Sequence, residues 1–225
     1  MKRFLSIILI VVGVVLLLIP TITDQIIKHY SENIPIEEIT ADEIEENNKK
    51  QVEYDFSVIK DIEISSVING ALNHDNDLVV GTMKIPDLGI SLPVMKGLSD
   101  ANLISGVATM KEDQILGQGN YTLAGHYTKN KKILLGGILD ISIGSIVYLS
   151  DKKFVYEYRI YDTVVVPDTA LDMLLDEKAE ERGKPILSLM TCYYTSKNGT
   201  RFFALGELLS TYPDETFQQN SDLLQ

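Results

Sequence analysis

The chain has 225 residues, which is enough for one ordinary domain with accessory segments, and 45% hydrophobic with 23% charged residues is the composition of a globular protein. Its formal net charge of -12 argues against a polyanion such as nucleic acid as a partner. A single cysteine is present, so the chain cannot form an intrachain disulfide.

The first predicted element is a membrane-spanning helix. Residues 4–23 are uncharged and mostly Ile, Val and Leu, and a helix of this length, at about 1.5 Å per residue, spans a hydrocarbon core of about 30 Å. Lys2 and Arg3 precede the run and Asp24 follows it, so the rest of the chain is expected on the extracellular side. The alternative is a cleaved signal peptide, but its apolar part is normally shorter, and no small-x-small cleavage site precedes Asp24. We therefore predict a retained anchor at residues 1–23, in the cell membrane with a cytoplasmic N-terminus.

An acidic segment follows at residues 24–79. Residues 24–63 hold 12 acidic and 4 basic side chains, and this composition predicts a solvated extracellular stalk that lifts the domain off the bilayer. His29 and His74 lie in this polar context and are expected to be surface histidines. The apolar side chains of the segment that are expected to dock on the following domain are Tyr54, Phe56, Val58 and Ile59.

From residue 80 the pattern changes to short apolar segments that are rich in β-branched and aromatic residues and separated by Gly, Pro and Asn. Short helices are expected at 99–107 and 134–139. Such a pattern predicts an all-β barrel or sandwich at 80–210, followed by a polar tail at 211–225. The sequence shows no metal-ligand cluster and no phosphate-binding glycine loop, so no metal or cofactor is predicted. The expected strands are 80–85, 90–95, 120–126, 145–149, 154–166, 186–192 and 201–208.

Three residues of this domain have the chemistry of a nucleophilic catalyst. His126 and Cys192 each end an expected strand, and Arg201 begins the strand that follows the Asn-Gly reversal at 198–199. If that turn makes the last two strands antiparallel neighbours, Arg201 lies level with Cys192. A free thiol has a pKa of about 8.5, so an imidazole that takes its proton makes it a nucleophile at neutral pH. A guanidinium is permanently charged and can stabilise an oxyanion.

Each signal alone has a simpler interpretation. A lone cysteine is often a buried, inert small hydrophobe, a histidine at a strand end is often structural, and an arginine is usually a surface residue. Their coincidence favours catalysis, because Cys192 is the only cysteine, His126 is the only histidine after residue 80, and Arg201 is one of four arginines in the chain.

The segments around these residues resemble the signature segments of the sortase family. They are Leu-Ala-Gly-His at 123–126, Leu-Met-Thr-Cys at 189–192, and the downstream Arg201. Residues 100–120 are similar to the stretch that precedes the histidine in class A, or housekeeping, sortases. The resemblance covers about residues 80–208 and the N-terminal anchor.

The resemblance implies an eight-stranded sortase-type β-barrel with short helices and a thioacyl transfer reaction. Cys192 would attack the Thr–Gly bond of a Leu-Pro-x-Thr-Gly sorting signal on a secreted protein. An amine of the peptidoglycan precursor lipid II would resolve the acyl-enzyme, which anchors the surface protein to the cell wall. His126 would serve as acid and base, and Arg201 would hold the oxyanion or the backbone of the signal. Ala124 and Thr191 match positions that line the substrate groove of the family.

The sequence departs from other sortases in ways that carry predictions. One branch of class A binds calcium through acidic residues, and the matching positions here are Lys111, Gln114 and Gln118, so no calcium requirement is expected. No second membrane segment is found at 212–225, unlike in many class C enzymes, and no extended lid is expected before the domain.

Two alternatives remain open on the sequence alone. The first is a cysteine endopeptidase or peptidoglycan hydrolase that uses water in place of the amine. The second is a noncatalytic adhesin or receptor module in which Cys192 is inert. Product analysis with an added amine distinguishes a hydrolase from a transpeptidase, because only a transpeptidase transfers the acyl group to the amine. Reaction with a methanethiosulfonate reagent tests the second alternative, because an inert, buried Cys192 would be protected.

Overall fold

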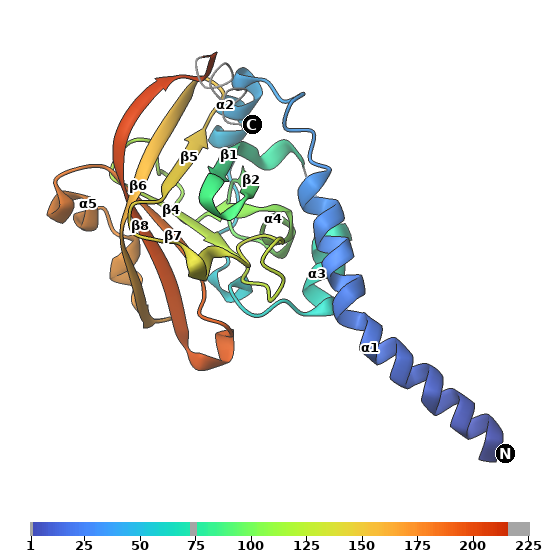
Figure 1. Cartoon of the computed structure of the whole chain (residues 1–225). Coiled ribbons are helices and arrows are strands. Elements are labelled where there is room, and N and C mark those ends of the chain that lie inside the picture. The colour runs from blue at the N-terminus through green and yellow to red at the C-terminus, as the bar shows by residue number, and fades with distance from the viewer. Residues whose placement is uncertain (1, 73–75, 216–225) are drawn as a thin grey trace.

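The structure is a computed structural model that describes residues 2–72 and 76–215. Within these residues, eight strands close into a β-barrel, and α1 projects away from it as one long helix (Figure 1). The predicted eight-stranded barrel with short helices is confirmed. His74 and residues 216–225 of the predicted tail lie outside the described residues.

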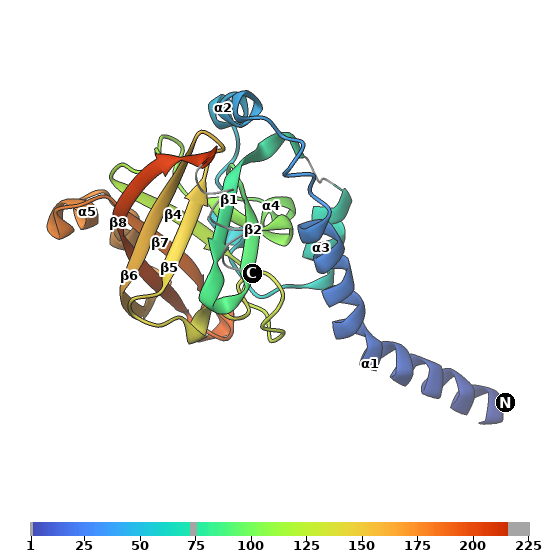
Figure 2. The ribbon, with the colours of Figure 1, turned by 45° about the horizontal axis from the view of Figure 1, so that its top comes forward.

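The barrel is closed in the order β1-β2-β3-β4-β7-β8-β6-β5, with β1 pairing β5 (Figure 2). Strands β2 and β3 and strands β4 and β7 are parallel pairs, and the other neighbours are antiparallel. Because β4 and β7 run in the same direction, the ends of both strands meet at one rim. The strands are β1 (Val79–Ile85), β2 (Ile90–Met95), β3 (Val107–Thr109), β4 (Asn120–Gly125), β5 (Ile146–Ser150), β6 (Phe154–Pro167), β7 (Ile186–Cys192) and β8 (Thr200–Pro213).

Most expected strands agree with the structure to within a residue or two. Strands β2 and β7 match their expected bounds, whereas β8 continues past residue 208 to Pro213 because it pairs with the beginning of β6, where Phe154 lies opposite Pro213. Residues 211–213, predicted as tail, are therefore part of the sheet. Strand β3 was not expected, since three residues carry too little alternation to be read as a strand.

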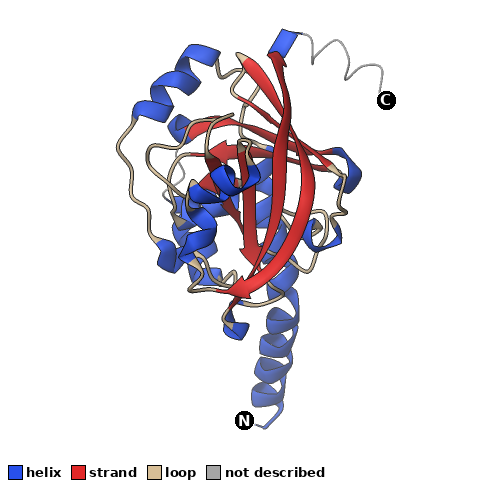
Figure 3. Cartoon of the chain, turned by 90° about the vertical axis from the view of Figure 1, so that its left-hand side faces the viewer, coloured by secondary structure: helices blue, strands red, loops and turns tan. Residues whose placement is uncertain are grey.

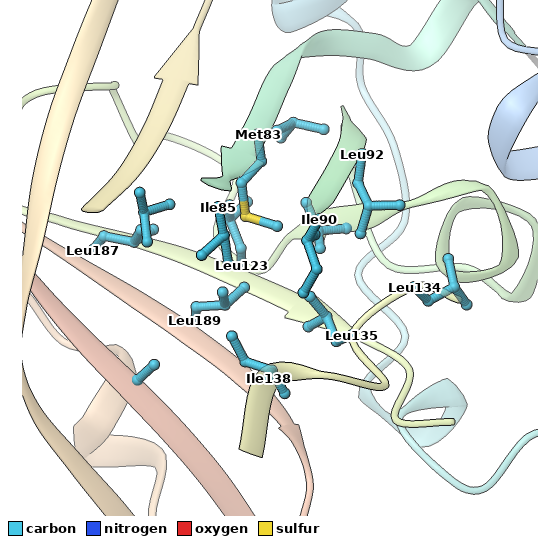
Figure 4. Close-up of a cluster of buried hydrophobic side chains, with 14 of the residues drawn as sticks. Met83, Ile85, Ile90, Leu92, Leu123, Leu134, Leu135, Ile138, Leu187 and Leu189 are labelled. Carbon is cyan, nitrogen blue, oxygen red and sulfur yellow. The ribbon is translucent and has the colours of Figure 1, made fainter. Parts of the chain in front are cut away.

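The barrel interior is an aliphatic core. Side chains of a strand alternate between its two faces, and the inward positions of β4 and β7 are filled by Leu123, Leu187 and Leu189, all fully buried (Figure 4). Full burial of such a side chain is worth about 1.5–3 kcal/mol. Packing of this interior fixes which residues of the same strands face outward.

Helix α1 (Lys2–Glu32) has an exposed apolar part near its N-terminus and a part near its C-terminus that packs on the domain. Its apolar side chains from Phe4 to Leu18 are exposed, and this part fits a single-pass membrane anchor. Near its other end, Ile27 is 1% exposed and shares the main core cluster with Val67 and Ile104. The helix therefore continues without interruption from the apolar stretch into contact with the domain (Figures 1 and 3). The other α-helices of the described residues are α2 (Ala41–Lys49), α3 (Ile64–Leu72), α4 (Asp100–Ser105) and α5 (Glu177–Arg182).

The acidic segment differs from the solvated stalk that its composition predicts. In α2, Ile44 is 3% exposed, and the buried side chain of Asn47 donates a hydrogen bond of 3.0 Å to the carbonyl of Val79 at the start of β1. The carboxylates lie on the outer face, while the few apolar residues pack on the barrel. The composition of the segment predicts the exposed carboxylates, but it does not predict that the few apolar residues pack on the barrel.

Candidate active site

The neighbouring strands β4, β7 and β8 present one outward face. On β7, Leu189 faces the barrel core. Because side chains alternate, Met190 faces outward, and so does Cys192, two residues further along the strand. Both lie in a second buried cluster, outside the barrel core, together with Ala124 of β4 and Phe203 of β8.

The strand registers place His126, Cys192 and Arg201 at neighbouring positions of this face. Cys192 of β7 pairs with Arg201 of β8, which confirms the prediction that these two residues lie opposite each other on neighbouring strands. Ala124 pairs with Met190 in the parallel register, and His126 and Cys192 are each two residues further along. Adjacent strands lie about 4.8 Å apart. The three residues therefore converge at one rim, although they are far apart in the sequence.

The thiol of Cys192 is covered. Cys192 is 3% exposed and packs in the outer cluster with Val58 and Ile59. Burial raises its pKa, the positive charge of Arg201 opposes this rise, and the negative charges of Asp61 and Asp168 add to it. In this covered state the sulfur is therefore a thiol rather than a thiolate.

The imidazole of His126 is also buried, with 3% exposure. Burial lowers its pKa to about 4, against the opposing effects of Asp100 and of a hydrogen bond to the backbone of Lys60. Its Nε2 atom is buried and has no hydrogen-bond partner in the described part of the chain. The ring is thus neutral at pH 7 and has one nitrogen available to exchange a proton.

The guanidinium of Arg201 meets a carbonyl oxygen. Its Nη2 donates to the backbone oxygen of Ile59 at 3.0 Å, and its Nη1 donates to that of Thr200 at 3.2 Å. Nη2 also lies 3.8 Å from the Oδ2 atom of Asp168. A planar cation that already binds a peptide carbonyl can also bind a substrate carbonyl or the oxyanion formed from it.

Residues 55–62, which we call the strap, contact all three side chains. Ile59 packs beside Cys192 and accepts from Arg201, and the backbone of Lys60 bonds His126. At one end, the backbone nitrogen of Asp55 donates to Leu98 at 3.3 Å. The expectation that no lid precedes the domain is wrong.

Asp61 holds the other end of the strap to the β7–β8 loop. Its carboxylate accepts from Thr195 Oγ1 and from the backbone nitrogen of Ser196, both at 2.6 Å, and its own nitrogen donates to Ser196 Oγ at 3.1 Å. Burial acts to raise the pKa of Asp61, but the hydrogen bonds from Thr195 and Ser196 outweigh it, so the pKa lies below its usual value.

A small apolar cavity of about 90 Å³ adjoins the site. Arg201 and Ile59 form part of its wall, and Met190, Leu174 and Met110 supply apolar surface. Leu174 belongs to the segment that connects β6 to β7. The cavity therefore lies between this segment, the strap and the outer face of the sheet.

Ala124 and Thr191 are both fully buried, and neither lines this cavity. The Thr191 hydroxyl donates to the Gly125 carbonyl at 2.8 Å, so it ties β7 to β4 just before His126. Substrate contact of either residue stays a prediction.

Of the positions compared with calcium ligands, Lys111 and Gln114 have side-chain partners inside the protein. Lys111 Nζ lies 2.7 Å from Asp176 Oδ1, which also accepts from the backbone nitrogen of Asn120 at 2.8 Å. The buried Gln114 side chain bonds Thr122 through both its oxygen and its nitrogen. Across residues 2–72 and 76–215, no group of three or more His, Cys, Asp and Glu side chains is placed to hold a metal ion.

The sequence reasoning missed the strap as part of the site. The signal was present, since Phe56, Val58 and Ile59 are apolar residues in an acidic segment and were expected to dock on the domain. What the spacing does not show is where they dock, because the contact between Ile59 and Arg201 joins residues 142 positions apart.

Comparison with known proteins gives one consistent result. The model of the sortase domain family matches residues 83–209. The chain is 36% identical to sortase A of Listeria monocytogenes, over 94% of this chain and 93% of that protein. It is also 36% identical to sortase A of Streptococcus agalactiae, over 85% of this chain and 78% of that protein.

Solved structures agree in fold. The structure of Listeria monocytogenes sortase A superposes with a TM-score of 0.55 at 33% identity and covers 60% of this chain and 90% of that one. Sortase C-3 from Streptococcus pneumoniae superposes with a TM-score of 0.60, covering 83% of this chain and 92% of that one, and at 19% identity this likeness concerns the fold alone.

Proposed function

The chain belongs to the sortase family of cysteine transpeptidases, which anchor surface proteins, and from this premise we propose that Cys192, His126 and Arg201 are its catalytic residues. The observation that carries the proposal is their register, which sets a thiol, an imidazole and a guanidinium at neighbouring positions of one outward face. Nucleophile, acid-base group and oxyanion stabiliser are the functions that acyl transfer needs.

The first half of the reaction makes a thioester. When the strap moves aside, the thiol of Cys192 and the imidazole of His126 regain solvent, and the proton passes from sulfur to the ring. The thiolate attacks the carbonyl carbon of the Thr–Gly bond, and Arg201 stabilises the negative charge on the oxygen. His126 then returns the proton to the leaving amine as the C–N bond breaks.

The donor substrate proposed for this site is a Leu-Pro-x-Thr-Gly-type sorting signal at the C-terminus of a secreted protein. The apolar wall formed by Met110, Leu174 and Met190 suits leucine and proline side chains, and Arg201 stands at the same cavity to meet the signal's backbone. Two relatives of this chain by sequence are named sortase A, the class that the resemblance indicated.

The acceptor proposed is an amine of lipid II or another peptidoglycan component. With Lys2 and Arg3 on the cytoplasmic side of a single-pass anchor, the catalytic domain lies outside the cell membrane, where both substrates are found. The amine attacks the thioester, a C–N bond replaces the C–S bond, and Cys192 regains its proton.

The test is incubation of the full chain, in detergent, with a fluorescent Leu-Pro-x-Thr-Gly peptide with and without an added amine. The full chain is needed because Ile27 and Val67 are part of the core. We expect cleavage at Thr–Gly and transfer to the amine, both abolished in Cys192→Ala with the circular dichroism spectrum unchanged. Hydrolysis that no amine diverts would instead identify a hydrolase, and activity in Cys192→Ala would exclude the proposed nucleophile.

A further inference from the structure

The rim of the barrel that holds the site carries two loops whose charge is opposite to that of the whole chain. Residues 127–132 follow His126 at the end of β4, and residues 193–199 join β7 to β8. The two loops hold four lysines and no acidic residue, whereas the whole chain has 32 acidic and 20 basic residues. We call this surface the basic rim, and its lysines, all exposed, are Lys129, Lys131, Lys132 and Lys197.

Three of these four ammonium groups face solvent rather than a carboxylate. Lys131 pairs with Asp140, with 2.5 Å between Nζ and Oδ2. Across residues 2–72 and 76–215, no carboxylate forms an ion pair with Lys129, Lys132 or Lys197. The positive charge of the basic rim is therefore available to a partner outside the chain.

The basic rim lies at the level where the anchor helix leaves the membrane. The uncharged run of α1 ends at Thr23, and Asp24 is the first charged residue after it. The side chain of Asn130 donates a hydrogen bond of 3.3 Å to Asp24 Oδ2, and Thr23 lines one cavity together with Lys129 and Tyr194. With residues 4–23 in the hydrocarbon core, both loops reach the headgroup layer, which is about 5–7 Å thick on each side.

The opposite end of the barrel points away from the bilayer. Helix α2 lies at the upper end of the barrel in Figure 1, whereas the N-terminal half of α1 descends away from the domain. Lys153, in the turn between β5 and β6, pairs with Glu45 of α2 at 2.6 Å. The carboxylates of α2 are thus at the end distant from the membrane, and the lysines of the basic rim are at the near end. An anionic surface below the basic rim favours this orientation of the domain.

Aromatic rings accompany the lysines. Tyr194 is 57% exposed, and its φ of 62° lies in the left-handed region that a tyrosine rarely adopts. Its ring makes an edge contact with that of Tyr127, with the centroids 5.9 Å apart. Tyrosine is enriched at membrane–water interfaces, because its ring is apolar and its hydroxyl is polar. An exposed ring beside lysines at headgroup level is the composition of an interfacial contact.

We propose that the basic rim docks on the headgroups of anionic phospholipids, with Lys129, Lys132 and Lys197 at the phosphates and Tyr194 in the interface. The contact turns the end of the barrel that carries the site toward the bilayer. The inference depends on the membrane anchor and not on the reaction proposed above. Each lysine near an anionic surface strengthens such binding about fivefold.

The experiment uses the absence of tryptophan from the sequence. The full chain with Tyr194→Trp is reconstituted in vesicles of phosphatidylcholine, with or without phosphatidylglycerol, that contain phospholipid brominated on its acyl chains. Bromine quenches tryptophan fluorescence at contact range. We expect strong quenching only with phosphatidylglycerol, and its loss in about 1 M salt, where the Debye length is about 3 Å.

Two controls locate the contact. Phe154→Trp places the reporter at an exposed position beside Lys153, at the opposite end of the barrel, and should not be quenched in either kind of vesicle. Asn198→Trp, at an exposed position of the same loop as Tyr194, serves as the reporter if Tyr194→Trp does not fold. Circular dichroism of each variant checks the fold.

Charge variants in the reporter chain test the lysines. Lys129→Gln and Lys132→Gln should each lower the equilibrium constant for docking about fivefold, as measured by quenching against the content of phosphatidylglycerol. Lys184→Gln removes the same charge from an exposed residue just before β7, at the end of that strand distant from Cys192, and should leave docking unchanged.

Three outcomes overturn the proposal. The first is the absence of quenching at position 194 with phosphatidylglycerol. The second is equal quenching in both kinds of vesicle with no effect of salt, which would mean that the anchor alone sets the position of the rim. The third concerns soluble glycerol phosphate, which has the same phosphate chemistry. We expect it to release the rim no more than sodium chloride of equal ionic strength, and a greater release would assign the lysines to a soluble phosphate.

Discussion

At Arg201, the geometry of the donor group matters as much as its charge. The guanidinium reaches the oxygens of Ile59 and Thr200 through two different nitrogens, an arrangement that a single ammonium cannot reproduce. We expect Arg201→Lys to lower kcat/KM for the signal peptide about a hundredfold or more, the usual result of losing an oxyanion donor. Steady-state cleavage assays measure this, and near-normal rates would end the oxyanion assignment.

The burial of His126 makes the stability of the folded chain depend on pH. Its pKa falls from 6.5 to about 4 in the folded chain, so the unfolded chain binds this proton more tightly. The contribution of His126 to stability is therefore complete above pH 6.5 and is lost as the pH falls toward 4. Urea unfolding at pH 7 and pH 4.5 should show a smaller loss in His126→Gln than in the parent chain. Equal losses would mean that the imidazole is solvated in the folded protein.

At the scale of elements, the strap covers the thiol of Cys192. Its attachment at Asp61 depends on a carboxylate that accepts from Thr195 and from Ser196. Because Asp61→Asn weakens these charge-assisted bonds, we expect the strap to open more often and Cys192 to react about tenfold faster with a methanethiosulfonate reagent.

The control for this prediction is Asp87→Asn. It removes the same charge from an exposed residue in the turn before Gly89. The reaction rate of Cys192 should be unchanged there, since Asp87 has no contact with the strap. Equal acceleration in both variants would show that net charge, and not the attachment at Asp61, governs access.

The segment before β4 carries its own cation. Lys111 pairs with Asp176, whose carboxylate is also fixed by the backbone of Asn120. Because these contacts lower the pKa of Asp176, led by the hydrogen bond from Lys111, a calcium ion would have to displace an ammonium to bind there. Cleavage rates measured with calcium and with a chelator should therefore agree, and a several-fold stimulation by calcium would contradict this expectation.

How far the sequence predicts the molecule depends on the element. Strand β7 could be placed because a short, mostly apolar run follows Pro185 and ends at Cys192, ahead of the Asn-Gly reversal at 198–199, and the level of Arg201 followed from the antiparallel connection. The reversal itself is a 3-10 turn at Ser196–Asn198, which ends at Gly199 in the left-handed region. The strap and α2 could not be placed, because their few apolar residues have no periodicity and their partners are distant in sequence.

At the scale of the whole molecule, the anchor and the barrel share one core. Ile27 of α1 is 1% exposed, so Ile27→Ala should destabilise the domain by about 2–4 kcal/mol through loss of burial and the cavity left behind. Thermal unfolding of the full chain in detergent should show a fall in Tm of several degrees. Ile22→Ala, at an exposed position of the same helix, is the control and should leave Tm unchanged.

Helix α1 runs continuously from the exposed apolar stretch at Phe4 to the buried Ile27, and this continuity bears on how a substrate would reach the site. Under the proposed function, a barrel that shares its core with the membrane anchor holds Cys192 at a fixed height above the bilayer. The exported polypeptide that carries the sorting signal would then have to place its Thr–Gly bond at that height. We therefore expect the distance that a signal can reach from the bilayer to limit which exported polypeptides are cleaved.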